Sequence, residues 1–216
     1  MVDGLTFALP KGRILRGAAS ILAAAGFDTR ALAADDRRLS IDLPGGHRVL
    51  LVKPIDVPTY VEYGVAELGI AGLDTLLEQG RDLYEPVDLG IGRCRLVVAE
   101  PTARPATLRR GTSVRVATKY PQVARRHYAG RGIDPEVIEL SGSVELAAVT
   151  ELADQIVDLV ESGETLRQNG LREVETIVDV TGRLVVHPAA SKLRPTVIAA
   201  AVAAIRAAAT ARQEVA

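Results

Sequence analysis

Aromatic residues and cysteines are scarce in this 216-residue chain. Tryptophan is absent, and aromatics make up only 3% of a sequence that is 48% hydrophobic. The interior must therefore be built from alanine, valine, leucine and isoleucine, which is ordinary for an α/β protein. The single Cys94 excludes an internal disulfide. The three histidines lack metal-ligand spacing, so we expect no structural metal site; they are His47, His127 and His187.

An excess of charge of either sign is also lacking. Twenty-six Lys and Arg residues stand against 27 Asp and Glu residues, for a formal net charge of −1. No global charge therefore favours nucleic acid or an acidic membrane surface, and any anion site must be local. No signal-like segment opens the chain, and no uncharged apolar run approaches the roughly 20 residues of a membrane span. We expect a cytoplasmic protein without nucleic-acid or membrane partners.

Apolar runs typical of strands alternate with segments of helical period, which predicts βαβ units and a largely parallel sheet. Residues 101–112 hold two prolines, a glycine and three arginines, which favours a linker before a second α/β unit. The β-branched segment 174–187 is long enough to pass from one domain back to the other. We therefore infer two α/β lobes with a cleft between them. A final helix from Pro195 should pack on a core through one stripe, made of Val197, Ile198, Ala201, Val202 and Ile205.

The segment DLVESGETLRQNG, residues 158–170, joins an apolar strand to a helix through a small-residue turn. Ser162 and Gly163 predict the turn, and Thr165 is placed to cap or open the helix. Such a strand–turn–helix presents backbone N–H groups to an anion such as phosphate. The carboxylates of Asp154 and Asp158 suit ribose hydroxyls or a phosphate-bound Mg²⁺. An equally simple interpretation makes Thr165 only a helix cap and Asp158 an edge-strand residue.

Two further strand ends carry a lysine. ALPKGR places Lys11 and Arg13 where a helix begins, which is the unfavourable end of the helix dipole for a cation. VRVATKYP places Lys119 at a corresponding point of the second lobe. Ligands of open α/β sheets bind beyond the carboxyl ends of strands, so both lysines could face an anion. They could also be solvated loop residues.

Two acids follow small-residue segments at predicted helix starts. Glu145 follows LSGSV, and Asp74 follows AELGIAGL. Each acid is explained by itself as a favourable charge in the first turn of a helix. A binding role for either acid depends on the residues around it.

Taken together, six segments resemble ATP phosphoribosyltransferase, in its short form, over nearly the whole chain. These are ALPKGR, KPIDVPTYVEYGVAELGIAGLD, GRCRLVVA, VRVATKYP, LSGSVELA and ADQIVDLVESGETLRQNGL. The resemblance implies the first step of histidine biosynthesis and a two-lobed fold like that of periplasmic binding proteins. It also implies a first, ATP-side lobe of residues 1–97 plus 180–216, with a second lobe of residues 98–179 inserted in it.

The resemblance implies that phosphoribosyl pyrophosphate (PRPP) binds the second lobe and that ATP binds the first. The residues that the resemblance implies for PRPP binding are Glu145, Asp154, Asp158, Ser162, Gly163 and Thr165. Those that it implies for ATP binding are Lys11, Gly12, Arg13 and Asp74, with possible phosphate contacts at Lys53, Arg95 and Lys119. No residue is assigned a catalytic role with certainty, and no metal is expected to bind the protein directly.

The implied reaction displaces Mg-pyrophosphate from the ribose by N1 of adenine, so the cofactor is Mg²⁺ carried with PRPP. The implied partner is a histidyl-tRNA-synthetase-like regulatory subunit, in a hetero-oligomer that contains a homo-dimer of this chain. Four places depart from the family pattern: Lys53, Leu73, Glu164 and the pair Thr150-Glu151.

Two other functions fit parts of the sequence. A two-lobed module that binds small solutes would share the fold, but it would leave the turn at 162–165 without a role. A phosphoribosyltransferase of the type that uses free bases would explain that turn but not the ALPKGR segment.

Overall fold

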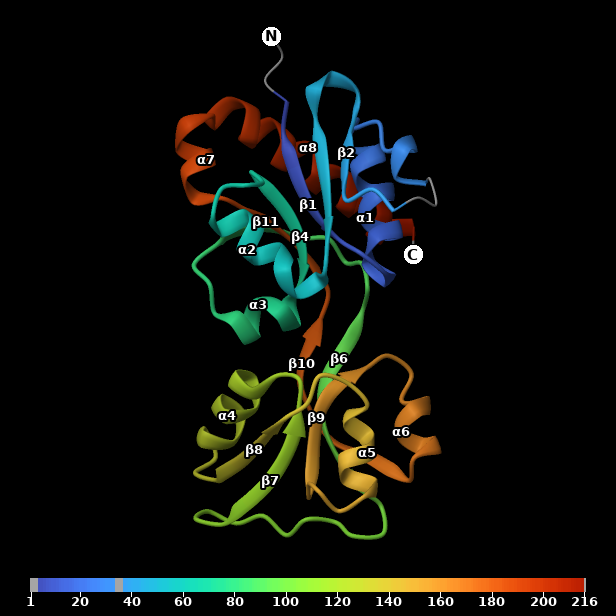
Figure 1. Ribbon diagram of the computed structural model, residues 1–216, viewed down its shortest axis with the longest axis vertical. Coiled ribbons are helices and arrows are strands. Elements are labelled where there is room, and N and C mark those ends of the chain that lie inside the picture. The colour runs from blue at the N-terminus through green and yellow to red at the C-terminus, as the bar shows by residue number, and fades with distance from the viewer. Residues whose placement is uncertain (1–3, 34–36, 216) are drawn as a thin grey trace. The chain divides into compact units, whose positions relative to one another are not determined.

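The computed structural model describes residues 4–33 and 37–215, and it shows an α/β protein of two compact units (Figure 1). Unit 1 comprises Met1–Leu76, Gly80–Gly92 and Thr181–Ala216, and unit 2 comprises Leu77–Gln79 and Arg93–Val180. Each unit holds its own sheet. The predicted α/β class is confirmed.

The sheet of unit 1 has the strand order β2-β3-β1-β4-β11-β5. The strands β3, β1 and β4 are parallel, while β2, β11 and β5 each join antiparallel. The sheet is therefore mixed rather than largely parallel. Its strands are β1 (Thr6–Pro10), β2 (Ser40–Asp42), β3 (Arg48–Val52), β4 (Leu68–Gly72), β5 (Tyr84–Asp88) and β11 (Gly182–Val186).

Helices and single 3₁₀ turns connect these strands. Phe7 and Leu9 of β1, Ile21 of α1 and Ile205 of α8 are almost fully buried in one core of aliphatic side chains. The helices are α1 (Arg13–Ala24), α2 (Val57–Glu62), α3 (Leu73–Gln79), α7 (Pro188–Leu193) and α8 (Pro195–Val215), and the 3₁₀ turns are η1 (Arg30–Ala33), η2 (Pro44–Gly46) and η3 (Pro54–Asp56).

The sheet of unit 2 has the order β10-β6-β9-β7-β8, with β9, β7 and β8 parallel. Ile156 of β9 and Ala147 of α5 are buried in its core. Its elements are β6 (Cys94–Pro101), β7 (Ser113–Thr118), α4 (Pro121–Ala129), β8 (Asp134–Glu139), α5 (Val144–Val149), β9 (Gln155–Val160), α6 (Glu164–Gln168) and β10 (Leu171–Val180).

Segment 101–112, predicted as a linker between lobes, lies within unit 2. The reason is that β6, which precedes it, already pairs with β9 and β10 of that unit. Pro101 therefore ends β6, and Pro105 and the three arginines belong to a loop of unit 2 rather than to a domain boundary. The predicted β segment 174–187 consists of two strands, since β10 ends at Val180 in one sheet and β11 begins at Gly182 in the other.

The terminal helix α8 packs on the core of unit 1, as predicted. Ile198, Ala201, Val202 and Ile205 are buried, but Val197 is 38% exposed, so its inclusion in the buried stripe was wrong. Position 197 immediately precedes the buried Ile198, and successive helical residues point about 100° apart.

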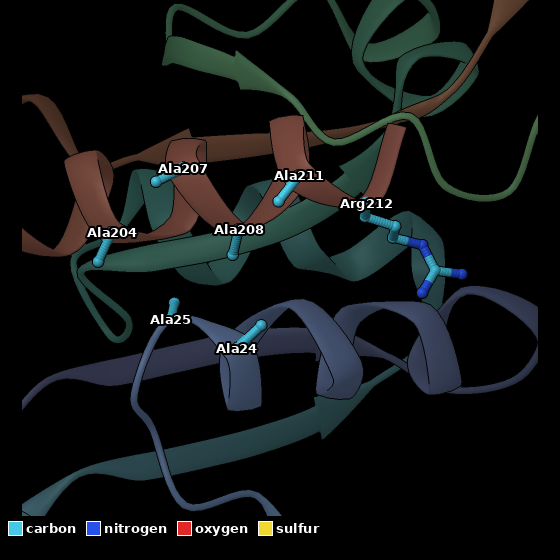
Figure 2. A pocket seen from close by; sticks show the side chains of 7 residues that line it. All are labelled: Ala24, Ala25, Ala204, Ala207, Ala208, Ala211 and Arg212. Carbon is cyan, nitrogen blue, oxygen red and sulfur yellow. The ribbon is translucent and has the colours of Figure 1, made fainter. Parts of the chain in front are cut away.

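The other side of α8 is rich in alanine. This helix is long and apolar enough to cross a membrane by length and composition alone. Ile198, Val202 and Ile205 of this helix are buried in the core, so we interpret it as a core helix. Figure 2 shows Ala204 and Ala208 of α8 directed toward Ala24 and Ala25 at the end of α1, across a groove of about 780 Å³.

The buried face of α8 predicts where truncation is costly. Ile205→Ala should lower the free energy of unfolding by about 2–5 kcal/mol, because the side chain is fully buried and leaves a cavity. Val197→Ala, at the exposed position, should cost under about 1 kcal/mol. Urea denaturation of both variants measures the difference; equal losses would contradict the packing described for α8.

Candidate functional site

A polar pocket of about 270 Å³ lies where β9 ends and α6 begins. The connecting turn includes Gly163, whose φ of +77° is a left-handed conformation that glycine adopts without strain. The pocket is lined by Glu145, Asp158, Leu159, Val160, Glu161, Ser162, Gly163, Glu164, Thr165 and Leu166. The structure thus brings together five of the six residues predicted to bind PRPP.

Asp158 is the most buried acid of this pocket, at 9% exposure. One of its carboxylate oxygens, Oδ1, accepts a hydrogen bond from the backbone N–H of Leu159 at 2.8 Å. The other, Oδ2, lies 4.0 Å from Nζ of Lys119. The strand register explains why Lys119 and Asp158 are close. Thr118 lies opposite Val157 in the parallel pair β7/β9, and Lys119 and Asp158 are the next residues of the two chain segments.

The pKa of Asp158 is raised above its usual value, chiefly because burial disfavours its charged form. The Leu159 hydrogen bond and the charge of Lys119 lower the pKa, and the charge of Glu145 raises it. Asp158 therefore responds electrostatically to one cation and one acid near the pocket.

Glu145 comes to the pocket from the first turn of α5. The preceding Ser143 has a φ of +47°, an uncommon conformation for a residue with a side chain. Ser143 is the residue at the N-cap of α5, and its side chain makes no capping hydrogen bond. The unusual backbone at Ser143 could not be read from the sequence.

The turn itself differs from prediction in one residue. The helix α6 begins at Glu164 after Gly163, so Thr165 is its second residue rather than its cap. Thr165 still lines the pocket. The hydroxyl of Ser162 accepts a hydrogen bond from the backbone N–H of Glu164 at 3.3 Å.

The carboxylate of Glu164 bonds within α6. It accepts hydrogen bonds from Arg167 Nη2 at 2.5 Å and from Gln168 Nε2 at 2.9 Å. These bonds hold the pKa of Glu164 below its usual value. An acid in the turn is therefore already matched by a cation three residues later.

Asp154 and Arg95 are not among the pocket residues. Asp154 precedes β9, whereas the pocket follows it, and its carboxylate receives Arg115 Nη2 at 2.7 Å and Nε at 3.2 Å. Arg95 is bound by Glu173, with Nη2 to Oε2 at 2.8 Å. Both ion pairs depend on strand pairing, which the sequence does not display.

The residues predicted to bind ATP gather at one edge of the sheet of unit 1. Pro10 of β1 lies opposite Val52 of β3, so Lys11 and Lys53 leave the sheet side by side, and the Lys11 N–H donates to the Val52 carbonyl at 2.9 Å. Gly12 follows with a φ of +93°, which favours glycine. Arg13 Nη2 donates to the Gly92 carbonyl at 3.2 Å.

Asp74 lies in the first turn of α3, directly after parallel strand β4, and is 9% exposed. It therefore follows the same carboxyl edge as Lys11 and Lys53. Sequence reasoning missed some pocket residues that border the predicted motif in unit 2, namely Leu159, Val160, Glu161 and Leu166. These residues lie within the same strand–turn–helix segment as the predicted ones, and that position could have indicated that they line the pocket.

Among residues 4–33 and 37–215, no group of three or more His, Cys, Asp or Glu side chains could hold a metal ion. The pocket acids Asp158 and Glu145 could supplement a metal that already carries other oxygen ligands. The donor set fits a metal brought by a ligand better than a resident one.

Electrostatics in the pocket can be tested by titration. Lys119→Met should raise the pKa of Asp158 further, and Glu145→Gln should lower it, because each change removes one charge that acts on Asp158. Carbon-detected NMR of the Asp158 carboxyl measures both shifts. Lys192→Met, at an exposed position of α7, serves as the control and should leave the titration unchanged; shifts of opposite sign would refute the assigned geometry.

Comparison with known proteins gives a consistent match. The family model of ATP phosphoribosyltransferase (HisG) matches residues 53–207. The chain is 51% identical over 197 residues to the ATP phosphoribosyltransferase of Syntrophotalea carbinolica, covering 90% of each. It is 49% identical over 213 residues to that of Sorangium cellulosum, covering 96% of this chain and 97% of the relative.

Solved structures give the same result for the fold. The ATP phosphoribosyl transferase (HisG:HisZ) complex from Thermotoga maritima contains a chain with a TM-score of 0.80 and 32% identity, covering 95% of this chain and 98% of that one. The periplasmic aliphatic sulphonate binding protein SsuA from Escherichia coli matches with a TM-score of 0.60 at 13% identity, covering 98% of this chain and 70% of that one. The predicted likeness to periplasmic binding proteins is confirmed for the fold, and the chain belongs to the ATP phosphoribosyltransferase family.

Proposed function

We propose that this chain transfers the 5-phosphoribosyl group of PRPP to N1 of ATP and releases pyrophosphate, the first step of histidine biosynthesis. The observation that carries the proposal is the pocket of Asp158, Glu145 and the 162–165 turn in a chain of this family. A solute-binding module would share only the fold, and identity of 51% to a transferase favours the enzyme.

PRPP would occupy the pocket after β9. The hydroxyls of Ser162 and Thr165 and the backbone N–H groups of the turn would donate to the 5-phosphate. Asp158 would accept hydrogen bonds from the ribose hydroxyls, and Glu145 would line the same pocket. We leave Asp154 out of the proposed site because Arg115 already binds its carboxylate at the other end of β9.

ATP would bind unit 1 at the edge that carries Lys11, Gly12, Arg13 and Asp74, with Lys53 as a further phosphate contact. Three cationic side chains at that edge support the assignment, because a triphosphate needs local positive charge in a chain of net charge −1. The proposed lobes, 1–97 plus 180–216 for ATP and 98–179 for PRPP, correspond to units 1 and 2 except for residues 77–79, 93–97 and 180, which group with unit 2.

The reaction would proceed by direct displacement. N1 of adenine attacks C1 of the ribose with its lone pair, the new C–N bond forms, and the bond from C1 to the pyrophosphate oxygen breaks with inversion. Because the attacking nitrogen carries a free lone pair, no general base is needed to start. The chain's own contribution would be to position two anionic substrates and to neutralise charge on the leaving group, with Lys119 a candidate for the second role.

Magnesium would enter as part of the Mg–PRPP substrate and leave with pyrophosphate. The pocket supports this proposal through its carboxylates, because Asp158 and Glu145 could add oxygen ligands to an ion that PRPP already binds. Asp158 and Glu145 would be the side chains nearest to the incoming ion.

We infer further that the chain acts as the short form, with a histidyl-tRNA-synthetase-like regulatory subunit that carries the histidine response. Support comes from the Thermotoga relative, which was solved as a HisG:HisZ complex. A homo-dimer of this chain within a cytoplasmic hetero-oligomer completes the proposal.

Removal of one hydroxyl tests the phosphate role. Thr165→Ala should weaken PRPP binding by about tenfold, because a hydrogen bond to a charged group contributes roughly 1.5–3 kcal/mol. Calorimetry with Mg–PRPP measures the affinity, and circular dichroism checks the fold. Thr210→Ala, at an exposed threonine of α8, is the matched control; unchanged affinity in Thr165→Ala would remove Thr165 from the phosphate site.

Dependence on a partner can be tested separately. The purified chain should bind PRPP and ATP yet form little product, measured as released pyrophosphate, and histidine should not inhibit it. Adding the regulatory subunit should raise turnover and introduce histidine inhibition. Full, histidine-sensitive turnover by the isolated chain would disprove the need for a partner.

A further inference from the structure

Thr118, the last residue of β7, is fully buried in unit 2. A hydroxyl in such a place costs free energy unless it is hydrogen-bonded. The Thr118 hydroxyl has two partners: it donates to the Val157 carbonyl at 2.6 Å and accepts from the Tyr120 backbone N–H at 2.8 Å.

Those two partners are chain neighbours of Asp158, which lines the pocket, and of Lys119, which does not line it but lies 4.0 Å from Asp158. Val157 immediately precedes Asp158, and Tyr120 immediately follows Lys119. One hydroxyl therefore ties the strand that carries the acid to the backbone that carries the cation. Where Lys119 leaves the sheet, its main chain is held on one side by the β7/β9 pairing and on the other by this hydrogen bond.

The corresponding strand end in unit 1 is fixed differently. There Pro10 ends β1, and the Lys11 backbone N–H donates directly to the Val52 carbonyl. No hydroxyl stands before that lysine. A buried threonine hydroxyl therefore fixes the strand end before Lys119, whereas a backbone hydrogen bond fixes the strand end before Lys11.

We propose that Thr118 is a positioning residue for substrate binding, which sets Lys119 against Asp158, an acid that lines the pocket. The inference rests on the proposed PRPP site. Thr118 would not touch PRPP itself. It would fix the direction in which Lys119 leaves β7, so that the ammonium group lies 4.0 Å from Asp158 Oδ2 and beside the bound anion.

Paired substitutions isolate the hydroxyl. Thr118→Val keeps the branched shape and removes the hydroxyl, whereas Thr118→Ser keeps the hydroxyl and loses one methyl group. We expect calorimetry with Mg–PRPP to show about five- to tenfold weaker binding for Thr118→Val, in the range of one or two lost hydrogen bonds, and a change under about twofold for Thr118→Ser. Thr118→Ala against Thr118→Ser repeats the comparison if Thr118→Val does not fold.

A double-mutant cycle separates positioning from a structural role. If Thr118 acts through Lys119, then Thr118→Val should change PRPP affinity by less than about twofold once Lys119→Met is present. A purely structural threonine would weaken binding by the same factor in both backgrounds, which would overturn the inference.

The failure of this inference is distinguishable from failure of the proposed function. Wild-type affinity in Thr118→Val overturns the positioning role while leaving the PRPP site in place. A wild-type chain that does not bind PRPP overturns the proposed site and, with it, the role of Thr118.

Discussion

The parallel register of β7 and β9 is the constraint on which the pocket depends. It places Thr118 opposite Val157, and therefore places Lys119, directly after β7, next to Asp158, two residues before β9 ends. The proposed displacement asks for positioning and charge neutralisation rather than for a nucleophilic side chain. A rigid strand edge meets that need, because side chains at its end are fixed by the sheet and the following loop can bend around a phosphate.

Burial raises the pKa of Asp158 at this edge. Asp158 is held where its charged form is disfavoured, and the nearby cation only partly offsets that cost. Glu164 would add an unfavourable charge to a pocket already lined by three other acids, but Arg167 and Gln168 engage its carboxylate within α6. The departure of Glu164 from the family pattern thus has a local compensation. Leu73, another of the four departures, has no structural explanation.

Local sequence patterns predicted the secondary-structure class well, but they predicted poorly which strands and charged side chains pair. The alternation of apolar runs and helical periods gave the α/β class and the buried face of α8, because both depend on nearby residues. Strand β5, the inclusion of β6 in unit 2, and the ion pairs of Asp154 and Arg95 depend on which distant strands meet. A buried network in unit 2 was equally invisible: Glu100 accepts hydrogen bonds from Gln155 and Arg172, residues that are 55 and 72 positions away.

The central claim is that the pocket after β9 binds PRPP, and amide NMR of the ¹⁵N-labelled chain tests it most directly. Titration with Mg–PRPP should shift the amide signals of residues 158–166 and of Lys119 more than those of α8. Shifts confined to other segments, or no shift at saturating PRPP, would contradict the account.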